Sequence, residues 1–288
     1  MAPKHTFTLN VTCNDRPGIV ASVSRVLFEV GANVTELQEY NDPITKRFFM
    51  RIVFDVPAEG AGKSTVEAVL LPVAQQFDLD WRLNDARQAK KVIIMVSQQD
   101  HCMRDLLYRT HIGELLMDVV AIVSNHAQPT QSDPLTENIP FYHLPVGKNT
   151  KPQQEAQIKE LVNSTGADFV VLARYMQILS DDLTEFLAQR CVNIHHSSLP
   201  GFKGAKPYHQ AYERGVKLIG ATAHFVTADL DEGPIIEQDV EHITHADLPA
   251  DLVRKGRDIE RRVLARAVSF LLQDRVFVNG QKTVVFRN

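Results

Sequence analysis

The feature that most constrains the fold is a series of short, almost uninterrupted apolar runs in the second part of the chain. They occupy residues 91–96, 118–124, 139–144, 168–173, 191–192 and 218–226. Strands that are apolar on both faces are typical of parallel sheets covered by helices on both sides. Segments of helical character separate or follow these runs, over residues 103–110, 152–163 and 249–272. The pattern therefore predicts a doubly wound, mostly parallel α/β domain, followed by a hairpin that turns at Asn279-Gly280.

The first 84 residues follow a different pattern. Alternating polar and apolar residues indicate half-buried strands, and two segments have helical spacing. The expected order is a strand at 5–12, a helix from Ile19 to Val30, strands at 32–40 and 47–56, a helix at 63–77 and a strand at 78–83. This βαββαβ order predicts a ferredoxin-like antiparallel sheet with two helices on one face. The expected domains are 1–84 and 91–288, with a polar linker at 85–90.

Composition excludes several classes of protein. The formal net charge of −4 gives no electrostatic reason to expect nucleic acid as a partner. No apolar run approaches the ~20 residues that a membrane-spanning helix needs, and the N-terminus lacks the apolar region of a signal peptide. The three cysteines, Cys13, Cys102 and Cys191, are odd in number and form no CxxC pair. We expect a cytoplasmic protein that binds neither nucleic acid nor membranes.

Polar residues gather where two of the apolar strands end. Asn193 and His195 are two residues apart, so an extended backbone places them on the same face, and the same holds for Thr222 and His224. Asp231 lies in the loop after the second strand. Because ligands of α/β sheets bind beyond the strand ends, an amide, imidazoles and a carboxylate are expected to converge there as a candidate active site.

The order Asn-x-His, a later His, and Asp-x-Gly falls on Asn193, His195, His224, Asp231 and Gly233. With this signature the chain resembles the folate-dependent formyltransferase family over nearly its whole length. The segment NIHHS, with His196 after the first histidine, resembles the hydrolytic branch of that family. Residues 1–84, with the turn Asp15-Arg16-Pro17-Gly18 opening the first helix, look like an ACT domain.

The resemblance implies an enzyme that hydrolyses 10-formyltetrahydrofolate to tetrahydrofolate and formate, supplying formate for one-carbon and purine metabolism. It implies that Asn193 and His195 donate hydrogen bonds to the oxyanion formed when water attacks the formyl group. Asp231 would orient and deprotonate that water, and we expect partial burial to raise its pKa. His224 would position Asp231. Supporting roles are expected for Thr222 and His196, with His196 and the loop 201–207 restricting access to water.

The resemblance also implies the binding sites. The folate ring is expected beside Met176, Gln177, Ile178 and Leu179, which follow an apolar strand. The reaction needs no cofactor, because 10-formyltetrahydrofolate is the substrate. The ACT-like domain is expected to assemble the chain into a homo-oligomer. It also carries a candidate effector site for an amino acid at Asn14, Asp15 and Gly18, where backbone N–H groups at a helix start suit a carboxylate.

Three other functions stay open. A formyltransferase acting on an amine such as glycinamide ribonucleotide needs a glycine-rich loop for the substrate phosphate, but residues 97–102 read SQQDHC, without glycine. Asp100 is expected there as a helix cap, with His101 and Cys102 in the same turn. A transferase acting on methionyl-tRNA would need a further tRNA-binding domain. A non-catalytic folate or amino-acid sensing module would not need the intact Asn193, His195 and Asp231.

Histidines are frequent after residue 190, and His242-x-x-His245 has a spacing that suits zinc. A catalytic zinc site needs three converging protein ligands, which the sequence does not show. Donors already aimed at an oxyanion also make a Lewis acid unnecessary. We therefore predict that no metal is bound.

Overall fold

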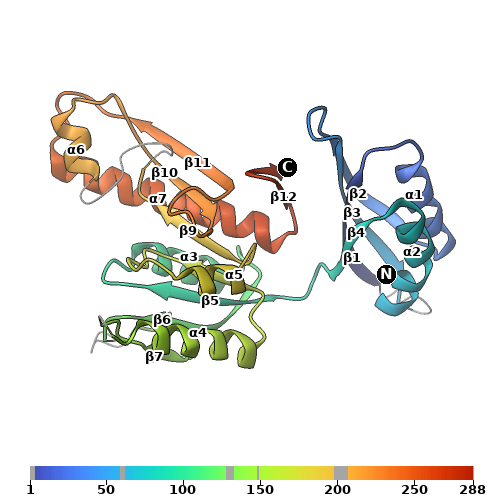
Figure 1. Cartoon of the computed structure of the whole chain (residues 1–288), viewed down its shortest axis with the longest axis horizontal. Coiled ribbons are helices and arrows are strands. Elements are labelled where there is room, and N and C mark those ends of the chain that lie inside the picture. Colours follow the sequence, from blue (N-terminus) through green and yellow to red (C-terminus); the bar gives the residue numbers. More distant parts are fainter. Residues whose placement is uncertain (1–3, 59–61, 128–132, 148, 198–206, 288) are drawn as a thin grey trace. The chain divides into compact units, whose positions relative to one another are not determined.

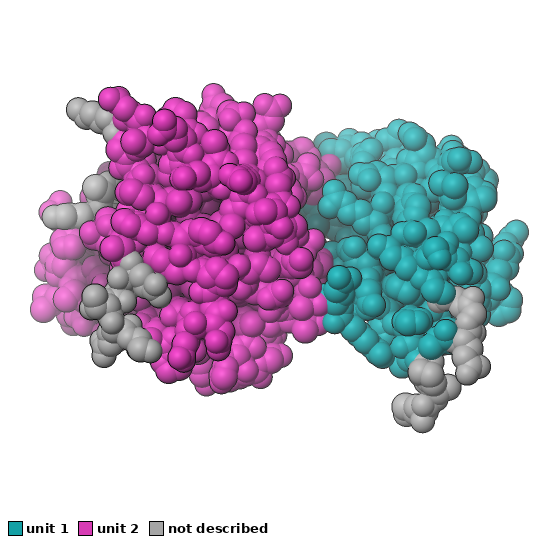
Figure 2. Space-filling model, turned by 90° about the horizontal axis from the view of Figure 1, so that it is seen from below, with its two compact units in different colours: residues 1–88, 273–277, 284–288 teal, residues 89–272, 278–283 magenta. Residues whose placement is uncertain are grey.

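The computed structural model describes residues 4–58, 62–127, 133–147, 149–197 and 207–287. The chain forms two compact units, coloured separately in Figure 2. Unit 1 comprises residues 1–88, 273–277 and 284–288, and unit 2 comprises residues 89–272 and 278–283. Two short C-terminal segments thus belong to unit 1, whereas the sequence analysis grouped them with the second domain. The boundaries at 84 and 91 stay a prediction.

Unit 1 is a four-stranded antiparallel sheet with both of its helices on one face (Figure 1). Its elements are β1 (Lys4–Asn14), α1 (Ile19–Glu29), β2 (Asn33–Asn41), β3 (Arg47–Pro57), α2 (Lys63–Phe77) and β4 (Asp80–Asp85). The strand order is β2-β3-β1-β4. The last strand begins two residues later than expected, because Asp78 has a left-handed backbone (φ 53°) and ends α2.

The alternation read from the sequence builds the core of unit 1. Leu9 and Val11 of β1 and Met50 and Ile52 of β3 are completely or almost completely buried, together with Val23 of α1. The other face of β3 is also covered, since Phe49 contacts Phe277 edge-on at 5.8 Å between ring centroids. Burial on both faces explains why β3 reads as a nearly continuous apolar run.

Unit 2 contains a seven-stranded sheet in the order β11-β10-β9-β8-β5-β6-β7. Its elements are β5 (Lys90–Val96), α3 (His101–His111), β6 (Met117–Ser124), β7 (Phe141–His143), α4 (Lys151–Thr165), β8 (Phe169–Leu172), α5 (Asp181–Phe186), β9 (Cys191–His195), α6 (Pro207–Glu213), β10 (Leu218–Phe225), β11 (Ile235–His242) and α7 (Pro249–Leu272). The hairpin of β12 (Val276–Asn279) and β13 (Lys282–Val285) follows. Strands β5 to β9 are parallel, and β10 and β11 are antiparallel to their neighbours.

Helices cover both faces of this sheet. Ile93 and Met95 of β5 lie in the core under α4 and α5, whereas Val92 and Ile94, equally buried, point to the opposite face. There α3 packs on α7, and α7 lies along β9, β10 and β11 (Figure 1). The predicted fold class, a ferredoxin-like domain followed by a doubly wound, mostly parallel domain, is confirmed. No helix among the described residues is long and apolar enough to cross a membrane.

Candidate active site

Antiparallel pairing of β9 and β10 brings four of the predicted site residues together. Asn193 is directly opposite His224, and His195 is directly opposite Thr222. Within each strand the two residues are two apart, so all four side chains lie on one face of the sheet. His195 and His224 are buried, with 6% and 2% of their surface exposed. These residues are held by main-chain pairing and not by a flexible loop.

Asp231 reaches this face through a tight turn after β10. Its backbone is left-handed (φ 58°), and one carboxylate oxygen, Oδ2, lies 3.2 Å from His195 Nδ1. The other oxygen, Oδ1, lies 3.7 Å from His224 Nε2. Gly233 is required two residues later, because a Cβ atom there would stand 1.7 Å from the carbonyl oxygen of Phe225. That close approach is the physical reason for the Asp-x-Gly spacing.

The pKa of Asp231 is shifted in the direction opposite to the one expected from the sequence. A hydrogen bond from His195, followed by the contact with His224, lowers this pKa well below its usual range, and together they outweigh the opposing effect of burial. The expectation of a raised pKa is therefore wrong. The carboxylate is therefore ionised throughout the physiological pH range and acts as a hydrogen-bond acceptor.

A short chain of hydrogen bonds orients the amide of Asn193. His224 Nδ1–H donates to the carbonyl oxygen of Phe225 at 2.9 Å, which leaves Nε2 of the neutral ring as an acceptor. Asn193 Nδ2 lies 3.3 Å from that Nε2 atom. One N–H of the amide is thereby held by His224, and the second N–H remains for another acceptor.

Thr222 is completely buried and does not line the pocket. Its hydroxyl donates to the carbonyl oxygen of Ser197 at 2.9 Å and accepts from Gln238 Nε2 at 2.9 Å. Thr222 therefore ties the chain just after β9 to β10, and it acts on the backbone that carries His195 and His196.

A pocket of about 250 Å³ opens over this face of the sheet. Its lining includes the predicted site residues Asn193, His195, His196, His224 and Asp231. The segment after β8 also lines it, with the four predicted folate-binding residues, Met176, Gln177, Ile178 and Leu179. Met176 and Ile178 expose 56% and 63% of their surface, so they are free to contact a ligand. Nε2 of His195 is buried and has no hydrogen-bond partner among the described residues.

His196 belongs to the same pocket and stays neutral near pH 7. Burial lowers its pKa to about 4, helped by the charges of Arg174 and His195. Its ring also contacts Tyr208 edge-on, at 6.4 Å between centroids. Most of the predicted water-restricting loop, residues 201–206, lies outside the described residues.

The sequence analysis missed a buried charged cluster beside the pocket. Glu260 of α7 is 1% exposed, and Tyr208 donates to its Oε1 atom at 2.6 Å. Gly256, one turn earlier, makes room, because a Cβ atom there would lie 2.1 Å from the Tyr208 ring. Arg174, directly after the predicted strand 168–173, has its Nε atom 3.5 Å from Glu260 Oε2. The only sequence signal was a charged residue at a strand end.

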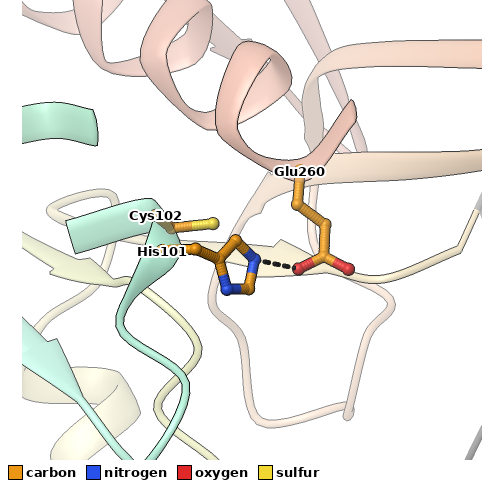
Figure 3. Close-up of side chains that lie close together, drawn as sticks. All are labelled: His101, Cys102 and Glu260. Atoms are coloured by element: carbon orange, nitrogen blue, oxygen red, sulfur yellow. Dashed lines mark hydrogen bonds and ion pairs between the residues drawn. The ribbon is translucent and has the colours of Figure 1, made fainter. Parts of the chain in front are cut away.

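His101 and Cys102 also belong to this cluster (Figure 3). His101 Nε2 lies 2.8 Å from Glu260 Oε2. The ligand atoms of His101, Cys102 and Glu260 lie within 4.8 Å of one another, the only such group among the described residues. Burial, followed by the charge of Glu260, raises the pKa of the Cys102 thiol, and Arg174 adds a positive charge nearby. Both effects disfavour a cation, so the absence of a metal stays our prediction.

Asp100 does not cap α3 in the expected way. It stands at the N-cap position, but its side chain accepts no hydrogen bond from the first turn. Its Oδ2 atom instead accepts from Arg104 Nε at 2.8 Å. The i,i+4 ion pair thus replaces the expected cap.

A second pocket, of about 520 Å³, lies in unit 1 at the start of α1. Asp15 and Gly18 line it, and Asn14 does not. Gly18 has a left-handed backbone (φ 95°) and begins the helix. Arg16, together with Glu39 and Asn41 of β2, completes the polar part of the wall.

Comparison with known proteins gives two family matches, "Formyl transferase" over residues 90–268 and "ACT domain" over residues 7–70. A formyltetrahydrofolate deformylase of Bacillus subtilis is 48% identical over 281 residues, covering 96% of this chain and 93% of that protein. The crystal structure of a formyltetrahydrofolate deformylase from Burkholderia mallei matches with a TM-score of 0.91 at 48% identity, covering 98% of this chain and 100% of the other. A glycinamide ribonucleotide transformylase from Symbiobacterium toebii matches at a TM-score of 0.63 and 27% identity, over 69% of this chain and 95% of its own.

Proposed function

Because this chain belongs to the formyltetrahydrofolate deformylase family, we propose that Asn193, His195 and Asp231 form the site at which it hydrolyses its substrate. The enzyme converts 10-formyltetrahydrofolate and water to tetrahydrofolate and formate. The observation that carries the assignment of the site is the cross-strand pairing of β9 and β10. It brings an amide and two imidazoles to one pocket, where the turn after β10 adds the carboxylate of Asp231.

The formyl group is an amide on N10 of the folate, so attack by water places negative charge on the formyl oxygen. We assign the stabilisation of this oxyanion to the remaining N–H of Asn193 and to Nε2–H of a protonated His195, whose Nδ1–H donates to Asp231. The hydrogen bond between Asn193 and His224 leaves one amide N–H available, and Nε2 of His195 is without a partner among the described residues. Donors that are already oriented and shielded from solvent cost no reorganisation when the charge appears.

The ionised Asp231 accepts a hydrogen bond from the attacking water and thereby orients its lone pair towards the formyl carbon. As the new C–O bond forms, Asp231 takes the water proton and passes it to N10, and the C–N10 bond then breaks. Formate leaves as an anion after it loses its remaining acidic proton. His195, beside Oδ2, holds the carboxylate in place during both transfers, and His224 holds the amide of Asn193.

Folate binding is assigned to the apolar side of the pocket, at Met176, Gln177, Ile178 and Leu179. The backbone of this segment is anchored, because Met176 N–H donates to the hydroxyl of Ser97 at 3.0 Å. No further cofactor enters this scheme. Three buried free cysteines, Cys13, Cys102 and Cys191, support a reducing compartment such as the cytoplasm.

We expect the purified protein to release formate and tetrahydrofolate from 10-formyltetrahydrofolate in equal amounts without any amine acceptor. Adding glycinamide ribonucleotide should not accelerate the reaction, because the segment between β5 and α3 has no glycine at which a phosphate could approach the backbone. Formate can be followed with a coupled dehydrogenase. Turnover that appears only with an amine acceptor would contradict hydrolysis and indicate a transferase.

For unit 1 we propose an amino-acid effector in the pocket at Asp15 and Gly18, and assembly of the chain into a homo-oligomer. Free N–H groups at the start of α1 suit the carboxylate of the effector, and Asp15 and Glu39 suit its ammonium group. The intact chain is the correct sample, since residues 273–277 and 284–288 belong to unit 1.

Calorimetric titration with the common amino acids should show binding by at least one of them, and Asp15→Ala should abolish it. Glu29→Ala is the matched control, because Glu29 is an exposed carboxylate at the far end of the same helix. If no amino acid produces a heat of binding or changes the rate of formate release, the effector site is wrong and only the assembly role of unit 1 is left.

A further inference from the structure

Arg174 carries a buried positive charge that the protein satisfies only in part. The residue is 7% exposed, although it lines the pocket that contains Asn193, His195 and Asp231. Its Nη2 atom donates to Gln99 Oε1 at 2.8 Å. Its Nε and Nη1 atoms are buried and have no hydrogen-bond partner among the described residues. An unsatisfied buried donor is costly, and more so when it is charged.

Glu260, the carboxylate that forms an ion pair with Arg174, is already engaged. Glu260 Oε1 accepts from Tyr208, and Oε2 accepts from His101 when the histidine presents its Nε2 hydrogen. Arg174 Nε lies 3.5 Å from Oε2, close enough for an ion pair but without hydrogen-bond geometry. Glu260 therefore balances part of the charge on Arg174 and leaves two N–H groups unused.

The backbone of Arg174 is held in a conformation that a residue with a side chain seldom adopts. Its φ angle is 65°, in the left-handed region. Ala173 N–H donates to Met95 O at 2.8 Å, and Ser97 N–H donates to Arg174 O at 3.2 Å, so β5 and the residue after it hold the segment on both sides. Strain of this kind at the carboxyl end of a strand is often associated with a functional site.

Hydrolysis creates a new need for positive charge in this pocket. The substrate carries a neutral formyl group, but the product formate is an anion that appears beside Asp231, whose pKa is lowered so that it too is ionised. Two carboxylates in one partly buried pocket repel each other unless a cation lies nearby.

We propose that Arg174 binds the formate released by the reaction, through the N–H groups that it does not use within the protein. A guanidinium presents paired N–H groups in a plane that matches a carboxylate, and such charge-assisted bonds are short and strong. This inference rests on the proposed function. It adds a product subsite to the pocket, and it assigns that subsite to a residue outside the Asn193, His195 and Asp231 arrangement.

The test is a titration of the intact protein with ¹³C-labelled sodium formate, followed by NMR, in the absence of folate. We expect Arg174→Gln to weaken formate binding at least about tenfold, the range expected when a charge-assisted hydrogen bond is lost. Arg174→Lys keeps the charge but loses the planar pair of donors, so its affinity for formate should lie between those of the wild type and Arg174→Gln. The same order is expected for product inhibition by formate.

Glu260→Gln is the matched control, because it separates an anion site from a purely structural ion pair. Removing the Glu260 charge leaves Arg174 less neutralised, so formate should bind more tightly, opposite to the effect of Arg174→Gln. If both variants bind formate as the wild type does, with unchanged melting temperatures, the proposal is wrong. It is equally wrong if Arg174→Gln raises only the KM for 10-formyltetrahydrofolate, since Arg174 would then hold a carboxylate of the folate.

Should Arg174→Gln fail to fold, Arg174→Lys and Glu260→Gln decide the question, because the first should weaken formate binding and the second should strengthen it. The titration requires no turnover, so it is independent of the proposed hydrolysis. If the protein produces formate without an acceptor, but substitution of Arg174 does not change its affinity for formate, only the product subsite is wrong. Absence of formate production overturns the hydrolytic function itself.

Discussion

Replacing Asp231 with asparagine should abolish formate release while leaving folate binding largely intact. Asparagine occupies the same volume but cannot accept a proton, so we expect kcat to fall by roughly 10²–10⁴-fold, the usual contribution of a positioned acid or base. The proposed folate-binding segment 176–179 follows β8, apart from the loop after β10 that carries Asp231, and should not respond. Rates from the formate assay and the affinity for tetrahydrofolate check the two parts separately.

Asp229→Asn is the matched control, because Asp229 is an exposed carboxylate of the same loop that does not line the pocket. It should retain wild-type activity. Near-normal turnover by a folded Asp231→Asn variant would remove Asp231 from the mechanism.

The same variant tests the direction of the Asp231 pKa. A carboxyl group whose pKa is lower in the folded than in the unfolded state stabilises the protein above the unfolded value, and this stabilisation is lost as pH falls through the folded pKa. Since the folded pKa of Asp231 is lowered, Asp231→Asn should be less stable than the wild type near pH 7. The difference should shrink only at pH values below the ordinary carboxyl range. Thermal melts across pH measure this.

Asn193→Ala should lower kcat by about 10²–10³-fold with little change in KM, as when one donor to an oxyanion is removed. The amide is held by His224, and its second N–H is the one we assign to the oxyanion. Asn163→Ala removes the same kind of side chain from an exposed position of α4 and should have no effect. If the loss appears in KM alone, Asn193 binds substrate and does not act on the transition state.

Much of the fold follows from local periodicity. Near-continuous apolar strands such as 91–96 and 168–173 require helices on both faces, and the structure has them. Strand geometry alone also places Asn193 with His195, and Thr222 with His224, on one side of their strands. What the strand pattern could not show is that β9 and β10 pair antiparallel with Asn193 opposite His224. Register depends on main-chain hydrogen bonds between segments that are distant in sequence.

The role of Gly233 is an intermediate case. Its spacing from Asp231 is visible in the sequence, but the reason is a carbonyl oxygen of Phe225 at 1.7 Å from where a Cβ would stand. The boundary of β4 is similar, because the left-handed residue that ends α2 could have been any of several polar residues near Asp78. In both places, composition indicates a turn, and only the folded backbone decides which residue forms it.

The sequence by itself determined the fold class, the family and the residues of the Asn193, His195 and Asp231 arrangement, because these depend on local spacing and on a signature carried by one continuous stretch. Only the tertiary structure decided the electrostatics. Whether the pKa of Asp231 rises or falls depends on two histidine contacts, at 3.2 and 3.7 Å, that compete with burial. The cluster of Arg174, His101, Tyr208 and Glu260 is assembled from the end of β8 and from helices α3, α6 and α7, with His101 and Glu260 159 residues apart. Charge–charge energies vary with distance and local dielectric, and neither quantity exists until the chain has folded.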